Sequence, residues 1–177
     1  MAEKKIVFFC SASYGIDPKY NQAARDMVRA ACLRGYTIVS GGAIKGTMGA
    51  IADEVAKCGG KHIGVLPHFM KDFEHPGLTE TVWTDTMSER KEKMREGTCA
   101  AIALPGGIGT LDELIETLTL AKLGKYDGQV FALNCGGFFN PLIFLLDYYV
   151  ETGMLDERSR GLIAFASSVE ELAGHLD

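Results

Sequence analysis

The sequence lacks the features that mark several classes of protein. Its five cysteines are scattered and odd in number, and no pair stands in Cys-x-x-Cys spacing. Cys10 and Cys99 lie in or beside apolar runs, where a free thiol behaves as a small hydrophobic group. This use of cysteine fits a reducing compartment better than secretion, and we expect a cytoplasmic protein.

Other absences concern membranes, nucleic acids and metals. No apolar run is long enough to cross a bilayer, and the first residues lead into a short strand without a signal peptide. The net charge of −5 argues against a general nucleic-acid binder. The four histidines show no metal-ligand spacing, and no Gly-x-Ser-x-Gly motif occurs. We expect neither a membrane nor a nucleic acid as partner.

What is present is a regular alternation of short apolar runs and helical patterns over 177 residues. This alternation predicts an α/β fold: one Rossmann-like, doubly wound, nucleotide-binding domain over residues 1–177, with a mainly parallel sheet and helices on both faces. The expected strands are 6–10, 37–40, 63–66, 81–83, 100–104, 130–133 and 162–165. The expected helices are 18–34, 48–57, 87–96, 111–123, 141–152 and one that begins at 169.

Three loops rich in Gly, Ser or Thr follow expected strands, at residues 11–15, 41–49 and 105–110. In a parallel sheet the carboxyl ends of the strands meet at one edge, where ligands bind. These loops therefore predict a nucleotide-sized pocket that includes Ser11, Gly41 and Gly42. The 41–49 loop is neither a Walker A motif nor a Gly-x-Gly-x-x-Gly motif. Its glycines could instead serve only close helix–strand packing.

The segment from Leu104 to Glu113 carries the strongest signal. A buried strand stops at Pro105, three glycines follow within four residues, and a helical pattern begins. This arrangement presents free N–H groups of a helix N-terminus to a phosphate, with Glu113 one turn away. Alternatively, Thr110-x-x-Glu113 is only a capping box, in which the two side chains satisfy backbone N–H groups. Ser168-x-x-Glu171 has the same spacing where nothing suggests a site.

A charged helix is expected just before this strand, with its own capping box at Thr86-x-x-Glu89. Most charged runs of this kind form solvated helix faces. If the helix packs beside the 105–110 loop, Arg90 could reach a substrate hydroxyl or Glu113. Neither Arg90 nor Glu113 is expected to be needed for packing.

Two linked motifs resemble those of a known family. Pro105–Glu113 matches Pro-Gly-Gly-x-Gly-Thr-x-x-Glu, and Met87–Met94 matches Met-x-x-Arg-Lys-x-x-Met, at the usual distance from each other. Together with Cys10–Gly15, Gly46–Gly49 and His75–Glu80, they make nearly the whole chain similar to the LOG ("Lonely Guy") phosphoribohydrolases. These enzymes activate cytokinins and were formerly labelled lysine decarboxylases.

The resemblance implies hydrolysis of the N-glycosidic bond of nucleoside 5′-monophosphates, AMP and N6-substituted AMP among them, to a free base and ribose 5-phosphate. It implies no cofactor and no metal. The family's catalytic residues fall on Arg90 and Glu113. Its nucleotide contacts fall on Lys91, Gly107, Ile108, Gly109, Thr110, Leu111, Asp112 and Thr119, and the loop adds Gly106.

Some positions depart from the family pattern and leave the preferred base open. A family glutamate is Asp72 here, which keeps the charge and shortens the reach. Ser88 stands where histidine is frequent, and Leu120 and Lys122 replace the Trp and Gln of a Trp-x-Gln element. The residues that carry the chemistry are unchanged.

The expected mechanism follows from the charge that bond cleavage builds on the ribose. The Glu113 carboxylate stabilises that charge and orients or deprotonates water, while Arg90 orients Glu113 and holds ribose hydroxyls. Two other hypotheses remain open: a non-catalytic nucleotide or cofactor carrier, and a pyridoxal-phosphate lysine decarboxylase, for which the chain is short.

The helix expected at 141–152 is apolar almost all round, which requires burial on more than one side. We therefore expect a homodimer whose interface borders the active site, as in the LOG family. The alternative is that the C-terminal segment folds over this helix and completes a monomeric core.

Overall fold

The computed structural model describes residues 3–177 and contains one seven-stranded sheet. Every strand pairing is parallel, in the order β4-β3-β2-β1-β5-β6-β7. The strands are β1 (Lys5–Phe9), β2 (Thr37–Ser40), β3 (His62–Pro67), β4 (Glu80–Thr84), β5 (Thr98–Ala103), β6 (Gln129–Leu133) and β7 (Ile163–Ala166). The predicted α/β fold with a parallel sheet is confirmed.

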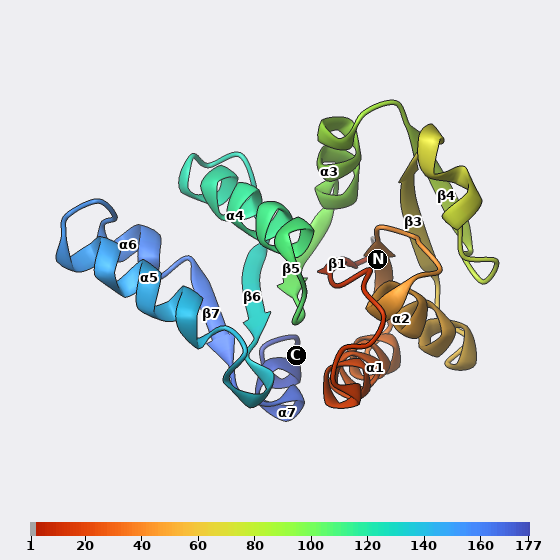
Figure 1. Ribbon diagram of the computed structural model, residues 1–177, viewed down its shortest axis with the longest axis horizontal. Coiled ribbons are helices and arrows are strands. Elements are labelled where there is room, and N and C mark those ends of the chain that lie inside the picture. The colour runs from red at the N-terminus through yellow and green to blue at the C-terminus, as the bar shows by residue number, and fades with distance from the viewer. Residues whose placement is uncertain (1–2) are drawn as a thin grey trace.

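The helices follow the strands along the chain and cover both faces of the sheet (Figure 1). They are α1 (Pro18–Leu33), α2 (Gly46–Lys57), α3 (Met87–Arg95), α4 (Ile108–Lys122), α5 (Asn140–Glu151), α6 (Glu157–Arg160) and α7 (Val169–Gly174), with short 3-10 turns η1 (His68–Phe73) and η2 (Cys135–Gly137). Side chains of α1, α2 and α7 pack with Ile6 and Phe8 of β1. Those of α3, α4 and α5 pack with Val7 and Phe9 on the other face.

Local sequence signals set several of the helix ends as expected. Asp17 caps α1 through a 3.0 Å hydrogen bond from the Lys19 N–H, and Pro18 follows at the first helical position. Gly35 has a φ of +79° directly after the C-cap, a conformation that glycine adopts without strain. At Thr86 and Ser168 the hydroxyl half of each capping box is formed, since each hydroxyl accepts from the N–H three residues on, while the glutamates accept from the N–H just before the cap.

The strand order reverses direction at β1. β2 and β3 lie on one side of β1, and β5 and β6 lie on the other. The loops that follow β1 and β5 therefore diverge, which leaves a crevice at the carboxyl ends of these two strands.

Two expectations about buried and covered groups need correction. Cys10 is buried as predicted, but Cys99 is exposed, and its thiol donates to the Lys5 carbonyl at 3.2 Å. Of the C-terminal segment, α6 packs on α5, where Arg160 pairs with Asp147, whereas α7 packs on α1, β6 and β7 and so leaves part of α5 uncovered. Phe144 of α5 is 75% exposed and Tyr148 is 50% exposed.

Candidate active site

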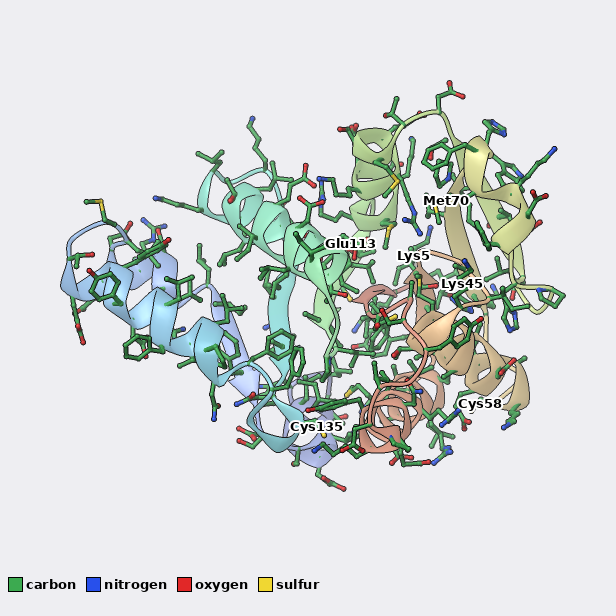
Figure 2. All side chains as sticks on the ribbon, in the orientation of Figure 1. Lys5, Lys45, Cys58, Met70, Glu113 and Cys135 are labelled. Atoms are coloured by element: carbon green, nitrogen blue, oxygen red, sulfur yellow. The ribbon has the colours of Figure 1, made fainter. Side chains whose placement is uncertain are left out.

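A cavity of about 300 Å³ lies in the crevice between the β1 and β5 loops. Its walls come from the loop after β1, from the end of β2, and from the facing helices α3 and α4. Glu113 lines it from α4 and Met70 from η1 (Figure 2). Of the residues predicted from the sequence, it brings together Ser11, Gly41, Arg90, Lys91, Gly107, Ile108, Gly109, Thr110, Asp112 and Glu113.

The glycine loop leads directly into α4. The N-cap is Gly107, with no side-chain capping bond, and the helix begins at Ile108, three residues earlier than expected. The first N–H groups of α4 therefore have no partner within the helix. The hydroxyl of Thr110 is buried and, among residues 3–177, makes no hydrogen bond. The alternative of a Thr110–Glu113 capping box is wrong, because both residues lie inside the helix.

Arg90 is 5% exposed, so the interpretation of this part of α3 as a solvated face is wrong. Its Nε donates to the Val65 carbonyl at 2.8 Å, and its Nη2 donates to the Gly41 carbonyl at 2.7 Å. Burial lowers the pKa of Arg90, and the nearby Glu113 opposes that change. Arg90 is also part of the packing, contrary to expectation.

Glu113 faces the cavity without a hydrogen-bond donor on its carboxylate, as far as residues 3–177 show. Burial raises the pKa of this carboxyl to about 7, and the positive charge of Arg90 partly opposes the rise. Burial has this effect because a charged carboxylate loses its hydration. A carboxyl that changes charge near neutrality is suited to acid–base chemistry.

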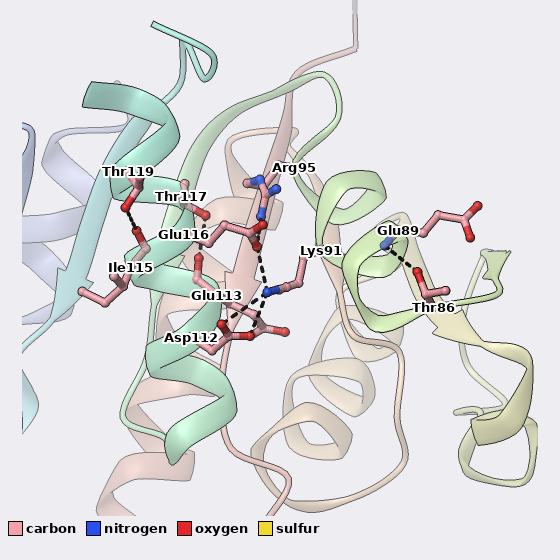
Figure 3. A network of polar contacts seen from close by, with 10 residues as sticks. All are labelled: Thr86, Glu89, Lys91, Arg95, Asp112, Glu113, Ile115, Glu116, Thr117 and Thr119. Atoms are coloured by element: carbon pink, nitrogen blue, oxygen red, sulfur yellow. Dashed lines mark hydrogen bonds and ion pairs between the residues drawn. The ribbon is translucent and has the colours of Figure 1, made fainter. Parts of the chain in front are cut away.

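A chain of ion pairs joins α3 to α4 beside the cavity (Figure 3). The Lys91 ammonium lies 3.0 Å from Oδ2 of Asp112 and 3.0 Å from Oε2 of Glu116. Arg95 donates to the same Glu116 oxygen at 3.0 Å. Since Lys91 follows Arg90 and Asp112 precedes Glu113, these contacts hold the two candidate catalytic residues on facing walls.

Five predicted contacts lie outside this cavity. Gly106 and Leu111 line an apolar hollow on the other side of the loop, beside α5. Thr119 lies farther along α4, where its hydroxyl donates to the Ile115 carbonyl at 2.8 Å. Asp72 is exposed on η1, and Gly42 packs against Gly64 and Leu66 of β3. Close packing is thus the role of Gly42 in this structure, and substrate contacts by all five stay predictions.

Reasoning from the sequence missed the apolar wall of the cavity. Four methionines line it, together with Phe8 and Cys10: Met48, Met70, Met87 and Met94. A signal was present, because Met87, Arg90 and Met94 follow the i, i+3, i+7 spacing of one helix face. Met48 and Met70 come from other elements, so only the fold brings them to the same place.

Comparisons with known proteins agree with this geometry. The family model described as "possible lysine decarboxylase" matches residues 48–176. The chain is 38% identical to cytokinin riboside 5′-monophosphate phosphoribohydrolase LOG4 of Arabidopsis thaliana, over 98% of this chain and 81% of the relative. It is 37% identical to the probable phosphoribohydrolase LOGL3 of Oryza sativa subsp. japonica, over 98% and 83% respectively.

Solved structures with the same fold include molybdenum cofactor proteins. The binding protein from Rippkaea orientalis superposes with a TM-score of 0.76 at 20% identity, over 99% of this chain and 96% of that one. The carrier protein from Chlamydomonas reinhardtii gives 0.75 at 18% identity, over 99% and 96%. At such low identity these two show the fold alone. The family model and the full-length relatives show more: the chain belongs to the LOG family.

Proposed function

We propose that this protein hydrolyses the N-glycosidic bond of nucleoside 5′-monophosphates, N6-substituted AMP of the cytokinin type and AMP itself among them. The products are the free base and ribose 5-phosphate. The observation that carries this proposal is the placement of Arg90 and Glu113 on facing walls of one cavity, next to the open N-terminus of α4. Relatives at 37–38% identity are named for this reaction on cytokinin riboside monophosphates.

The 5′-phosphate binds at the start of α4. The N–H groups of the first turn and the helix dipole favour an anion there. Gly107 and Gly109 leave open space around the main chain, so that phosphate oxygens reach the N–H groups. The buried, unpartnered hydroxyl of Thr110 adds one more donor. These contacts use binding energy remote from the reacting bond to hold the ribose in place.

Cleavage of the bond between C1′ and the base nitrogen builds positive charge on the ribose. The Glu113 carboxylate stabilises this charge and takes a proton from the water that attacks C1′, while the bonding electron pair leaves with the base nitrogen, which takes up a proton from solvent. The Nη1 group of Arg90 takes part in neither main-chain hydrogen bond, so it remains available for ribose hydroxyls. The base leaves against the methionine wall, whose flexible thioethers adapt to substituents of different shape.

Incubation with AMP and with an N6-alkylated AMP, followed by chromatography of the products, tests the reaction. We expect equimolar base and ribose 5-phosphate from wild-type protein and nearly none from Glu113→Gln. Tight nucleotide binding without any product would contradict hydrolysis and favour a carrier. Activity in both proteins at similar rates would remove Glu113 from the mechanism.

We further propose a cytoplasmic homodimer whose interface includes α4 and α5. Exposed apolar side chains run along both helices: Ile108, Leu111, Phe144, Leu145, Tyr148 and Tyr149. A patch of this kind is characteristic of an association surface.

In the described residues no helix is long and apolar enough to cross a membrane. Light scattering should give a mass twice that of the 19.2 kDa chain. The Phe144→Asp variant should be a monomer. A wild-type protein that is fully active as a monomer would refute the dimer.

A further inference from the structure

Gly41 lines the cavity, but the space beside its Cα is already filled by other side chains. It directly follows β2 and is buried, and its Cα is covered by the guanidinium of Arg90. A Cβ built at this position would overlap Nη2 of Arg90, and it would lie 3.2 Å from the Cζ atom. The Sδ atom of Met48 would lie 2.8 Å away. The absent side chain is therefore space that the Arg90 guanidinium occupies.

The same glycine also binds Arg90 by its main chain. Its carbonyl accepts the 2.7 Å hydrogen bond from Nη2, while the Val65 carbonyl of β3 accepts from Nε at 2.8 Å. Two fixed carbonyls determine the plane of a guanidinium, because its N–H groups point in a rigid fork. The bond from Nη2 to Gly41 requires the guanidinium to lie against the Cα of residue 41.

Backbone strain does not explain why this residue is glycine. The φ of Gly41 lies outside the left-handed region, so alanine could adopt the same conformation. Its neighbour differs: Gly42 has a φ of +70° and abuts Gly64 and Leu66. The requirement at position 41 is thus space, most of it for the Arg90 guanidinium and some for the Met48 thioether.

We infer that Gly41 is a positioning residue and not a substrate contact. It holds the Arg90 guanidinium between the Gly41 and Val65 carbonyls in the position that the reaction needs. This inference rests on the proposed function, in which Arg90 holds the ribose. Its consequence is that a methyl group at position 41 displaces Arg90 and leaves the phosphate site at α4 untouched.

The test is Gly41→Ala, with Gly174→Ala as its control. Gly174 is the last residue of α7, where an added Cβ would meet no atom within 4 Å and the φ is not positive. Misplacement of a catalytic group by about 1 Å can cost on the order of 100-fold in rate. We expect Gly41→Ala to lower kcat for AMP by roughly 10- to 100-fold with KM within about threefold of wild type, and Gly174→Ala to match wild type. Unchanged kcat, or a raised KM at unchanged kcat, would overturn the inference.

If Gly41→Ala does not fold in the wild-type chain, the same substitution is tested in an Arg90→Lys protein. Lysine ends in a single ammonium and lacks the Nη2 branch that abuts Gly41. Thermal unfolding should therefore show that Gly41→Ala destabilises the Arg90→Lys protein much less than it destabilises wild type. Equal destabilisation of wild type and of the Arg90→Lys protein would show that the methyl group meets something other than Arg90. It would refute the proposed role of Gly41 in positioning Arg90.

Arg90→Ala separates this inference from the function on which it rests. If Arg90→Ala retains near-normal turnover, the proposed mechanism fails. If Arg90→Ala is inactive while Gly41→Ala keeps normal kcat, the mechanism stands and only the role of Gly41 is wrong.

Discussion

Arg90 and Glu113 line one cavity from two facing helices, yet no hydrogen bond or ion pair joins them within residues 3–177. Arg90 directs two donors to main-chain carbonyls, and the half-buried Glu113 faces the cavity without a donor on its carboxylate among the described residues. A role of Arg90 in orienting Glu113 therefore stays a prediction. The positive charge of Arg90 opposes the rise in the pKa of Glu113.

The pH dependence of turnover follows from this environment. Burial raises the pKa of Glu113 to about 7, and the mechanism uses the carboxylate. We expect kcat to rise with pH up to about 7 and to fall roughly tenfold per unit below it. The groups around Glu113 are Arg90, Lys91, Arg95, Asp112 and Cys10.

The measurement is kcat at saturating AMP, because the substrate's own phosphate titrates near pH 6 and affects KM. Asp112→Asn should move the midpoint to lower pH, since the negative charge of Asp112 raises the pKa of Glu113. A rate that stays flat between about pH 5 and 8 would contradict the role of the carboxylate.

Glu113→Gln should stabilise the protein at alkaline pH. The pKa of Glu113 is about 7 in the folded chain against an ordinary 4.5, so the folded state binds the proton more tightly. The stabilisation that comes from this tighter proton binding is fully present below about pH 4.5 and is lost as the pH rises to about 7. Thermal unfolding near pH 8 should show Glu113→Gln more stable than wild type by about 1–3 kcal/mol. Near pH 4 the two should agree, and a variant less stable at both pH values would show that Glu113 is needed for the fold.

Thr110→Val tests the phosphate site. Loss of a hydrogen bond to a charged group costs about 1.5–3 kcal/mol, so KM for AMP should rise roughly tenfold or more. Stability should change little, because the Thr110 hydroxyl is buried and has no partner among the described residues. Thr37→Val is the matched control: Thr37 is also buried, at the start of β2, and its hydroxyl donates to Glu3. Equal KM in both variants would remove Thr110 from the site.

Local patterns predict those features that neighbouring residues determine. The Asp17 cap, the turn at Gly35 and the alternation of strands and helices need only short stretches of chain. The predicted start of α4 is too late, because Ile108 is 87% exposed and gives no sign of periodic burial. The same exposure makes Ile108 available to a partner.

Contacts between distant elements could not be predicted in this way. The charge of Arg90 pointed to solvent, whereas carbonyls from β3 and from the end of β2 receive it in the core. The pKa of Glu113 depends on burial by elements far away in sequence. Motifs identified the reactive residues, but their environment is a property of the assembled fold.

In the proposed reaction, α4 holds a 5′-phosphate while Glu113 and Arg90 act on the glycosidic bond. The ratio of kcat/KM for AMP to that for adenosine tests it most directly, because the two substrates share the base, the ribose and the bond that breaks. With several donors to the phosphate, each contributing about 1.5–3 kcal/mol, we expect AMP to be preferred by at least about 100-fold. Equal values for AMP and adenosine would contradict the account.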